Sequence, residues 1–175
     1  MFSRPTLNRR RCGILLIILS VMLLRSVGLQ AADVVTLKAI SMDIARDIAQ
    51  GAITACRDAG YQITAVVVDR SAVPQVILRD LYAPRFTLDI AQEKANTVIL
   101  AGTSTAEFLA NRQDLTQTLN HVDGLLALRG GLPIRVAGAL VGAIGVSGAP
   151  GGDIDERCAQ QGLDGVAERL EFADF

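Results

Sequence analysis

Six polar residues lie close together in the middle of the chain and could bind an anionic ligand. Arginine and lysine side chains hold carboxylates and phosphates through charge-assisted hydrogen bonds. An equally simple interpretation is structural. Arg79 and Asp80 would then end a strand in solvent, and Lys94 would pair with a carboxylate of its own helix, Asp89 or Glu93. The six residues of the cluster are Arg79, Asp80, Tyr82, Arg85, Thr87 and Lys94.

His121 is the only histidine, and it follows Asn120 in a polar stretch. Because imidazole is the commonest metal ligand, His121 is a candidate ligand for a metal ion or a haem iron. A single histidine cannot complete a zinc site of ordinary spacing. An ordinary loop histidine with no ligand is the alternative.

Several familiar catalytic and nucleotide-binding patterns do not fit this chain. Residues 145–148 nearly match G-x-S-x-G, but Ala149 replaces the second glycine, and a glycine–proline loop follows where a helix should begin. A nucleophilic Ser147 with His121 as its base is therefore disfavoured. Between residues 130 and 152 no segment fits G-x-G-x-x-G or G-x-x-x-x-G-K, so nucleotide binding is unsupported.

The first 32 residues have the organisation of a secretory signal peptide. A basic stretch at residues 1–13 precedes an apolar run at 14–24 and then a segment of small and polar residues. The apolar run is shorter than the roughly 20 residues that a membrane-spanning helix needs, and Arg25 ends it. We therefore expect cleavage near Ala31 or Ala32, a periplasmic or secreted protein, and no stable membrane span afterwards. An uncleaved N-terminal anchor is the alternative.

Removal of residues 1–32 would change the charge of the protein. The full chain has 17 Lys and Arg against 18 Asp and Glu, and five of the positive charges lie in this segment. Residues 33–175 then carry 12 positive and 18 negative charges, a net charge of −6. An acidic domain with few aromatic residues is not expected to bind nucleic acid. Binding of an anionic ligand would depend on local Arg and Lys groups.

Export also changes what the cysteines can do. Cys12 would leave with the signal peptide, so Cys56 and Cys158 would remain. Two thiols in an oxidising compartment can form a disulfide. Two separately buried thiols are the alternative.

The first half of residues 33–175 predicts a helix, a hairpin and two more helices. Apolar residues at helical spacing over 36–59 precede Gly60, and the β-branched run 63–68 and residues 75–79 form a hairpin. Thr87 is expected to cap a helix over about 88–100. Ser104 and Glu107 fit a capping box that opens a short helix to about Asn111, with an irregular segment at 112–124.

The second half predicts another hairpin and a last helix. Strands at 132–136 and 140–146 would join tightly through Ala137 and Gly138, with 125–128 as an added edge strand. A capping box at Asp153 would open a helix reaching about Leu170. The order α-β-β-α-α-β-β-α indicates one α+β domain with a central antiparallel sheet of about five strands flanked by helices.

The later hairpin contains a strand of unusually small residues. Side chains alternate along a strand, so one of its faces would consist of Ala139, Val141, Ala143, Gly145 and Ser147. Such a face allows close approach of a helix, a second subunit or a flat ligand. Packing of a helix is the simplest interpretation.

Four segments together resemble the haem-degrading-domain family, the group that includes the HbpS and GlcG proteins. They cover nearly all of the chain after the signal peptide and occur in the same order. The segments are AGYQITAVVVDRSAVPQVILRD (59–80), TLDIAQEKANTV (87–98), GGLPI (130–134) and VGAIGVSGAPGGDIDERCAQQGL (141–163). A DE-x-CA segment like residues 155–159 is usual in the exported branch of that family.

The resemblance implies a compact α+β domain at residues 33–175 that binds haem or a related tetrapyrrole and forms a homo-oligomer. In that interpretation Arg79, Arg85 and Lys94 would face the propionates, and Thr87 would belong to the same site. The chain departs from the family pattern where Phe86 replaces a histidine. If that histidine holds the haem iron, this chain uses another group, for which Tyr82 and His121 are the candidates, or binds haem less well.

The resemblance leaves three functions open. The first is capture, storage or sensing of haem outside the cytoplasm. The second is enzymatic haem breakdown that depends on a reductant. The third is an oligomeric accessory protein that binds no ligand, because fold alone does not fix function.

Overall fold

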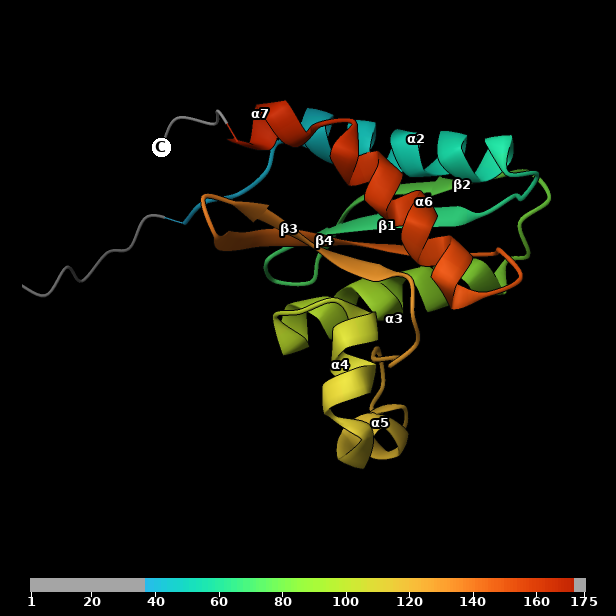
Figure 1. The fold of residues 1–175 in the computed structure, drawn as a ribbon, viewed down its shortest axis with the longest axis vertical. Coiled ribbons are helices and arrows are strands. Elements are labelled where there is room, and N and C mark those ends of the chain that lie inside the picture. Colours follow the sequence, from blue (N-terminus) through green and yellow to red (C-terminus); the bar gives the residue numbers. More distant parts are fainter. Residues whose placement is uncertain (1–36, 172–175) are drawn as a thin grey trace, which may run out of the picture. The chain divides into compact units, whose positions relative to one another are not determined.

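The structure is a computed structural model that describes residues 37–171, and the expected signal peptide lies outside these residues. One antiparallel sheet of four strands, in the order β2-β1-β4-β3, forms its centre (Figure 1). The strands are β1 (Thr64–Asp69), β2 (Pro74–Arg79), β3 (Gly131–Val136) and β4 (Ala139–Ser147). The helices are α2 (Met42–Asp58), α3 (Phe86–Ala101), α4 (Thr105–Asn111), α5 (Gln113–Leu119), α6 (Gly152–Asp164) and α7 (Ala167–Glu171). The predicted α+β architecture is therefore confirmed.

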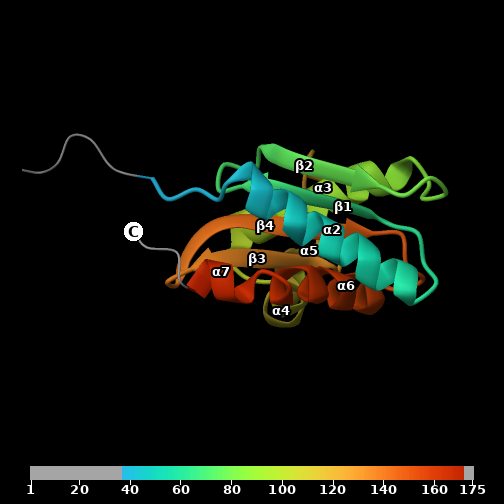
Figure 2. The ribbon, with the colours of Figure 1, turned by 90° about the horizontal axis from the view of Figure 1, so that it is seen from above.

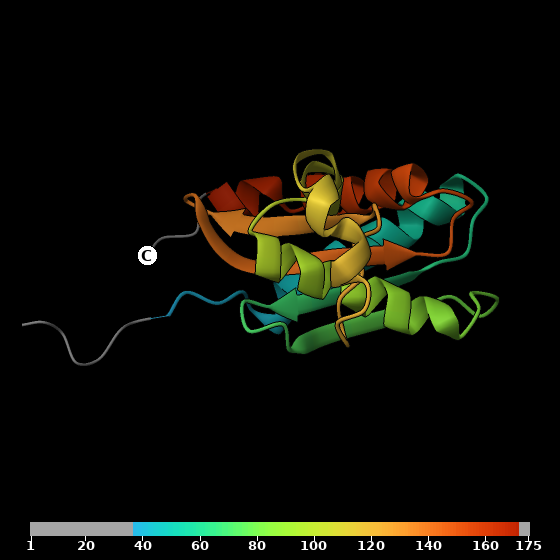
Figure 3. The same cartoon turned by 90° about the horizontal axis from the view of Figure 1, so that it is seen from below.

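Helices cover both faces of the sheet. Figure 2 shows α2 and α6 side by side over one face, and Figure 3 shows α3 on the other. The larger core lies under α2 and α6, whereas a smaller core of valines and alanines lies under α3. Strand β1 is central and buried on both faces, which explains its continuous β-branched sequence. None of the helices in residues 37–171 is long and apolar enough to cross a membrane.

The small residues of β4 make room for α3. A Cβ added to Gly145 would lie 1.9 Å from the carbonyl oxygen of Ala91 in α3, so only glycine permits this approach. Ala143 belongs to the core beneath the same helix. Val141 lies on the opposite face, because the pairing of β3 with β4 is irregular at that point. Helix packing, the simplest interpretation of the small-residue face, is confirmed for Ala143 and Gly145, whereas Ala139 is exposed.

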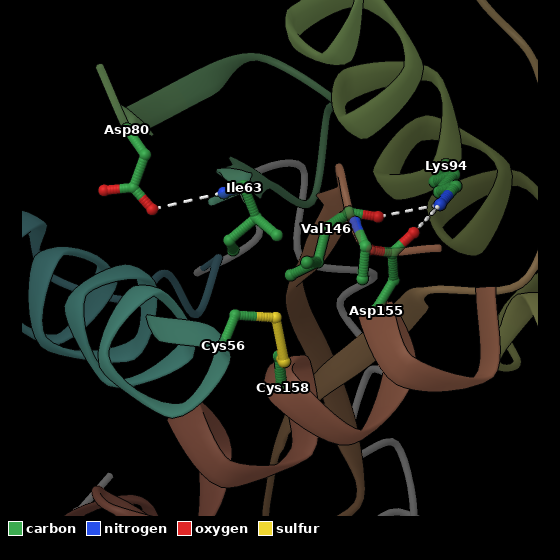
Figure 4. The surroundings of a disulfide bond; sticks show 8 residues. Cys56, Ile63, Asp80, Lys94, Val146, Asp155 and Cys158 are labelled. Atoms are coloured by element: carbon green, nitrogen blue, oxygen red, sulfur yellow. Dashed lines mark hydrogen bonds and ion pairs between the residues drawn. A yellow bond between two sulfur atoms is a disulfide. The ribbon is translucent and has the colours of Figure 1, made fainter. Parts of the chain in front are cut away.

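The disulfide joins the first described helix to α6. Cys56 of α2 and Cys158 of α6 are bonded to each other across a sequence separation of 102 residues (Figure 4). Gly51 and Gly162 bring the two helices together, because a Cβ on Gly51 would lie 2.9 Å from the Cα of Gly162. The thiol pair expected from the sequence is thus a bond between neighbouring helices.

The fifth, edge strand at 125–128 does not form. Two of its backbone donors are taken by side chains, since Leu126 N donates to Thr97 Oγ1 and Ala127 N donates to Asn120 Oδ1. The segment 112–124 is also less irregular than expected, because it contains α5.

Two predicted helix starts differ in the structure, and one is confirmed. Ser104 caps α4 by accepting a hydrogen bond from Glu107 N at 3.1 Å, as the capping box predicts. Helix α3 begins at Phe86, so Thr87 lies inside its first turn and does not cap it. Helix α6 begins at Gly152 with no side-chain cap, and it ends before Gly165 instead of continuing to Leu170.

Candidate functional site

An exposed surface of aromatic and arginine side chains lies where β2 ends and α3 begins. We call it the aromatic–arginine surface. Its apolar members are unusually exposed, with 76% of Leu81, 79% of Tyr82 and 58% of Phe86 accessible. It consists of Arg79, Leu81, Tyr82, Arg85 and Phe86, three of which belong to the cluster predicted from the sequence.

The loop that carries this surface is held from beneath by Asp80. Its carboxylate is buried, accepts hydrogen bonds from the Arg57 guanidinium of α2, and accepts another from Ile63 N at 3.1 Å (Figure 4). Asp80 is therefore not the solvated strand end that the structural interpretation of the sequence describes. It fixes the start of the loop against α2 and against the residue that precedes β1.

Arg79 and Gln62 fix the rest of the loop. Arg79 Nη1 donates to the carbonyl oxygens of Asp80, Leu81 and Ala83. Tyr82 N donates to Gln62 Oε1 at 2.9 Å. The Arg79 guanidinium thus stabilises its own loop, and the exposed rings stand on an ordered backbone.

Arg85 and Phe86 form a cation–π pair at the first turn of α3. The Arg85 guanidinium carbon lies 4.4 Å from the centroid of the Phe86 ring. A guanidinium stacked on an aromatic ring keeps its N–H donors at the edge free for carboxylates. A planar aromatic ligand with carboxylates matches this combination of groups.

Thr87 is buried behind this surface and does not face a ligand. Its Oγ1 donates to Pro84 O at 2.7 Å and lies 2.6 Å from Thr64 Oγ1 of β1. The Thr87 hydroxyl therefore joins the start of α3 to the sheet.

Lys94 is also removed from the predicted cluster, because its ammonium group is buried. Nζ donates to Asp155 Oδ2 and to Val146 O, both at 2.8 Å, and only 1% of the side chain is exposed (Figure 4). The expected pairing with Asp89 or Glu93 is wrong, and Lys94 is not available to a propionate. Burial lowers the pKa of Lys94 and raises the pKa of Asp155, while the attraction between the two opposes both shifts.

The glycine-rich segments that carry the family resemblance meet at this ion pair. A Cβ on Gly130 would lie 2.9 Å from Lys94 Nζ and 2.8 Å from Asp155 Cβ. Val146 N donates to Gly130 O, and Asp155 Oδ1 accepts a hydrogen bond from Ala149 N. These segments therefore enclose a buried charge pair. No local pattern indicates that Asp155 is the partner of Lys94, since the two residues lie 61 positions apart.

His121 lies in a different place from Tyr82. It is exposed, and its loop is tied to the middle of α3 where Asn96 Nδ2 donates to Gly124 O. Asn96 is ten residues beyond Phe86, or about 15 Å along a helix. The two candidate iron ligands are thus alternatives at separate positions. In residues 37–171 no group of three or more His, Cys, Asp or Glu side chains could hold a metal ion.

An apolar cavity of about 410 Å³ lies away from the aromatic–arginine surface. None of its lining residues is a His, Cys, Met or Tyr, and its Arg112 is already paired with Asp114. Its lining is Leu100, Ala101, Thr103, Glu107, Phe108, Asn111, Arg112, Leu115 and Leu119. The aromatic–arginine surface therefore suits a tetrapyrrole better than this cavity does, because it offers Tyr82 as an iron ligand and Arg85 as a donor to carboxylates.

Comparison with protein families identifies the fold. The model of the family described as haem degrading protein HbpS-like matches residues 40–164. The chain belongs to the HbpS-like family. The resemblance inferred from the four sequence segments is thereby confirmed.

Solved HbpS structures are similar to this HbpS-like chain over most of its length. A crystal structure of HbpS has 33% identity and a TM-score of 0.71, and the match covers 79% of this chain and 97% of that one. A doubly substituted variant of Streptomyces reticuli HbpS has 34% identity and the same TM-score, with 79% and 94% covered. No curated protein sequence matches this chain.

More distant structures show the HbpS-like fold alone. The Klebsiella pneumoniae protein ORFY has 23% identity and a TM-score of 0.72, with 78% of this chain and 97% of that one covered. The PduOC–haem complex has 23% identity and a TM-score of 0.67, with 73% and 95% covered.

Proposed function

We propose that this chain is an exported protein that binds haem or a related tetrapyrrole and serves its capture, storage or sensing. The observation that carries the proposal is the exposed aromatic–arginine surface on a fixed loop of an HbpS-like fold. Rings of Tyr82 and Phe86 offer apolar contact to a macrocycle, and Arg85 offers donors to its carboxylates. The haem-bound PduOC structure shows that a protein of this fold holds haem.

The residues at the surface fit the group that the family description implies. Arg85 would hold a propionate, Leu81 and Phe86 would contact the macrocycle, and Tyr82 would be the nearest oxygen ligand for iron. His121 is the alternative iron ligand, on the loop beside the middle of α3. Haem, when bound, would supply an iron centre for redox chemistry or for signalling. Thr87 and Lys94 would support the site from within the domain.

Export and assembly belong to the same proposal. A signal peptide at residues 1–32 would precede one domain at 33–175, and cleavage near Ala31 or Ala32 would release it into the periplasm or the medium. The Cys56–Cys158 disulfide supports an oxidising destination, since such bonds are rare in the cytosol. A homo-oligomer is expected from the family. Expression of the full chain in a bacterial host, followed by N-terminal sequencing and gel filtration of the exported protein, tests these points.

Titration with hemin tests the binding function. The exported protein should give a saturable shift of the Soret band at micromolar hemin. Tyr82→Phe and His121→Ala should then be compared, because loss of the spectrum in one of them identifies the iron ligand. Absence of a saturable shift contradicts the binding proposal, and an accessory protein without a ligand would then be the better description.

Haem breakdown is the second candidate function, and the description of the family favours it. Addition of ascorbate to the hemin complex distinguishes the two functions. An enzyme would lose the Soret band and release iron that a ferrous chelator detects. A binding protein would keep its spectrum under the same conditions.

A further inference from the structure

The aromatic–arginine surface contains no side chain of the kinds that most often ligate haem iron. His121 lies beside the middle of α3, and Cys56 and Cys158 are bonded to each other. Met42 stands at the start of α2, on the other face of the sheet (Figure 2). In residues 37–171 the iron of a bound haem at this surface would therefore meet no imidazole, thiolate or thioether.

Tyr82 is the only oxygen ligand that the surface offers. Its side chain is exposed, and in the part of the chain described no hydrogen bond or ion pair reaches its hydroxyl. Its backbone N–H is held by Gln62, but none of the described hydrogen bonds orients the phenol oxygen toward a ligand. The surface is thus poorly prepared for coordination.

The same surface is well prepared for contacts that do not depend on a metal. The Arg85–Phe86 pair presents a ring and a guanidinium together, 4.4 Å apart, and the exposed rings stack with any planar aromatic system. Dispersion, stacking and the hydrogen bonds of a guanidinium to a carboxylate act on the macrocycle and its side arms. These contacts do not depend on whether a metal occupies the centre of the macrocycle.

The loop is ordered before any ligand arrives. The Arg79 guanidinium holds three carbonyl groups of the loop. The buried Asp80 anchors the first residue of the loop to α2 and to Ile63, just before β1. A fixed loop costs less conformational entropy on binding. Weak contacts to a flat ligand therefore contribute more net binding free energy here than they would on a mobile segment.

We infer that this surface recognises the planar, carboxylate-bearing macrocycle and not the iron, so that metal-free dicarboxylic porphyrins bind about as well as haem. The inference rests on the proposed function and specifies the ligand class of the same site. Arg85 and Phe86 are the residues that recognise the ligand, and Tyr82 contributes its ring more than its oxygen.

Parallel titrations of the exported protein with hemin and with protoporphyrin IX test the inference. Quenching of porphyrin fluorescence and the Soret shift report the two dissociation constants. Constants within about fivefold of each other support metal-independent recognition. Saturable hemin binding with protoporphyrin IX more than fivefold weaker overturns the inference and leaves haem binding intact. Failure of both ligands to saturate overturns the proposed function itself.

Matched variants show whether this surface is the site. Phe86→Ala and Arg85→Gln should each raise the dissociation constants of both ligands about three- to tenfold. This is the usual contribution of one aromatic or cation–π contact. Leu100→Ala, an exposed residue at the other end of α3, and Arg157→Gln, an exposed arginine of α6, should leave both constants unchanged. The dimethyl ester of protoporphyrin IX should bind the native protein more weakly than protoporphyrin IX does. The Arg85→Gln variant should bind the two compounds equally well. Unchanged binding in Phe86→Ala and Arg85→Gln overturns the inference.

Discussion

Lys94 Nζ and Asp155 Oδ2 lie 2.8 Å apart inside the domain, with 1% and 5% of their side chains exposed. The pair joins α3 to the first turn of α6 and uses Val146 O as a further acceptor. Both charged groups are removed from water, and a buried charge without a partner costs far more free energy than a paired one. The pair therefore ties the helix that begins at the candidate site to the helix that carries the disulfide.

We predict that Lys94→Met lowers the free energy of unfolding by about 3–5 kcal/mol, because it leaves the Asp155 carboxylate buried without its cation. Lys94→Met combined with Asp155→Leu should restore most of this loss, since no charge then remains to be desolvated. Urea unfolding of the wild type and of both variants measures the difference. A double variant as unstable as the single one contradicts the role of the pair.

The stability of Lys94→Met should depend on pH with a definite sign. Burial raises the pKa of Asp155 in the native state, and the Lys94 ammonium opposes that shift, so its removal raises the pKa further. A carboxyl group with a raised pKa binds protons more tightly in the folded protein, so stability from this group increases as pH falls toward 3.8. The deficit of Lys94→Met should therefore shrink between pH 7 and pH 4.5, by up to about 1.4 kcal/mol for each pH unit of that window.

The double variant Lys94→Met/Asp155→Asn is the control for this pH effect. It has no carboxyl group at the position, so its deficit relative to the wild type should vary much less with pH. Urea unfolding at the two pH values measures both deficits. A Lys94→Met deficit that is equal at pH 7 and pH 4.5 would refute the prediction.

Removal of the disulfide should destabilise the protein strongly. The bond closes a long loop, since Cys56 and Cys158 are separated by 102 residues, and a loop of that length corresponds to about 4–5 kcal/mol in the chain-entropy estimate. Cys56→Ala/Cys158→Ala should lose about 3–5 kcal/mol of unfolding free energy. Dithiothreitol in the denaturant should lower the unfolding free energy of the wild type but not that of the double variant. An unfolding free energy of the wild type that does not change with dithiothreitol would contradict the prediction.

Ala72 occupies a backbone conformation that favours glycine. Its φ is +62°, in the turn where Asp69 Oδ1 accepts hydrogen bonds from Ser71 N and Val73 N. Ala72→Gly should raise the unfolding free energy by about 0.5–1 kcal/mol, the relief of the left-handed strain less the added entropy of the unfolded chain. Ala59→Gly is the matched control. Ala59 is exposed and Ala72 half-buried, but the φ of Ala59 is −82°, so glycine there should destabilise the protein.

Local sequence patterns determined most of the secondary structure, because they act through neighbouring residues. The β-branched run of β1, the tight turn through Ala137 and Gly138, and the cap at Ser104 are all decided within a few residues. The small residues of β4 likewise predicted that a helix lies close to the strand. The motifs were specific enough to predict the HbpS-like family as well.

Competition between local and distant partners limited the prediction elsewhere. Residues 125–128 have the composition of a strand, yet Thr97 and Asn120 take two of their backbone donors. Thr87 is of a residue type that often caps helices, yet its hydroxyl donates a hydrogen bond to Pro84 O and lies beside Thr64 of β1. A sequence pattern cannot show that such a distant partner is within reach.

Residue type alone identified the side chains that could bind an anionic ligand, because arginine, lysine and aromatic side chains have the right chemistry wherever they lie. Only the tertiary structure separated them. Long-range packing buried Lys94 against Asp155, turned Arg79 to its own loop, and left Arg85, Tyr82 and Phe86 in solvent. Burial and partner distance are properties of the folded chain, because they depend on residues far apart in the sequence, such as Lys94 and Asp155 at a separation of 61 positions. The charge pattern therefore located the candidate site, and the fold decided which of its residues are free to bind.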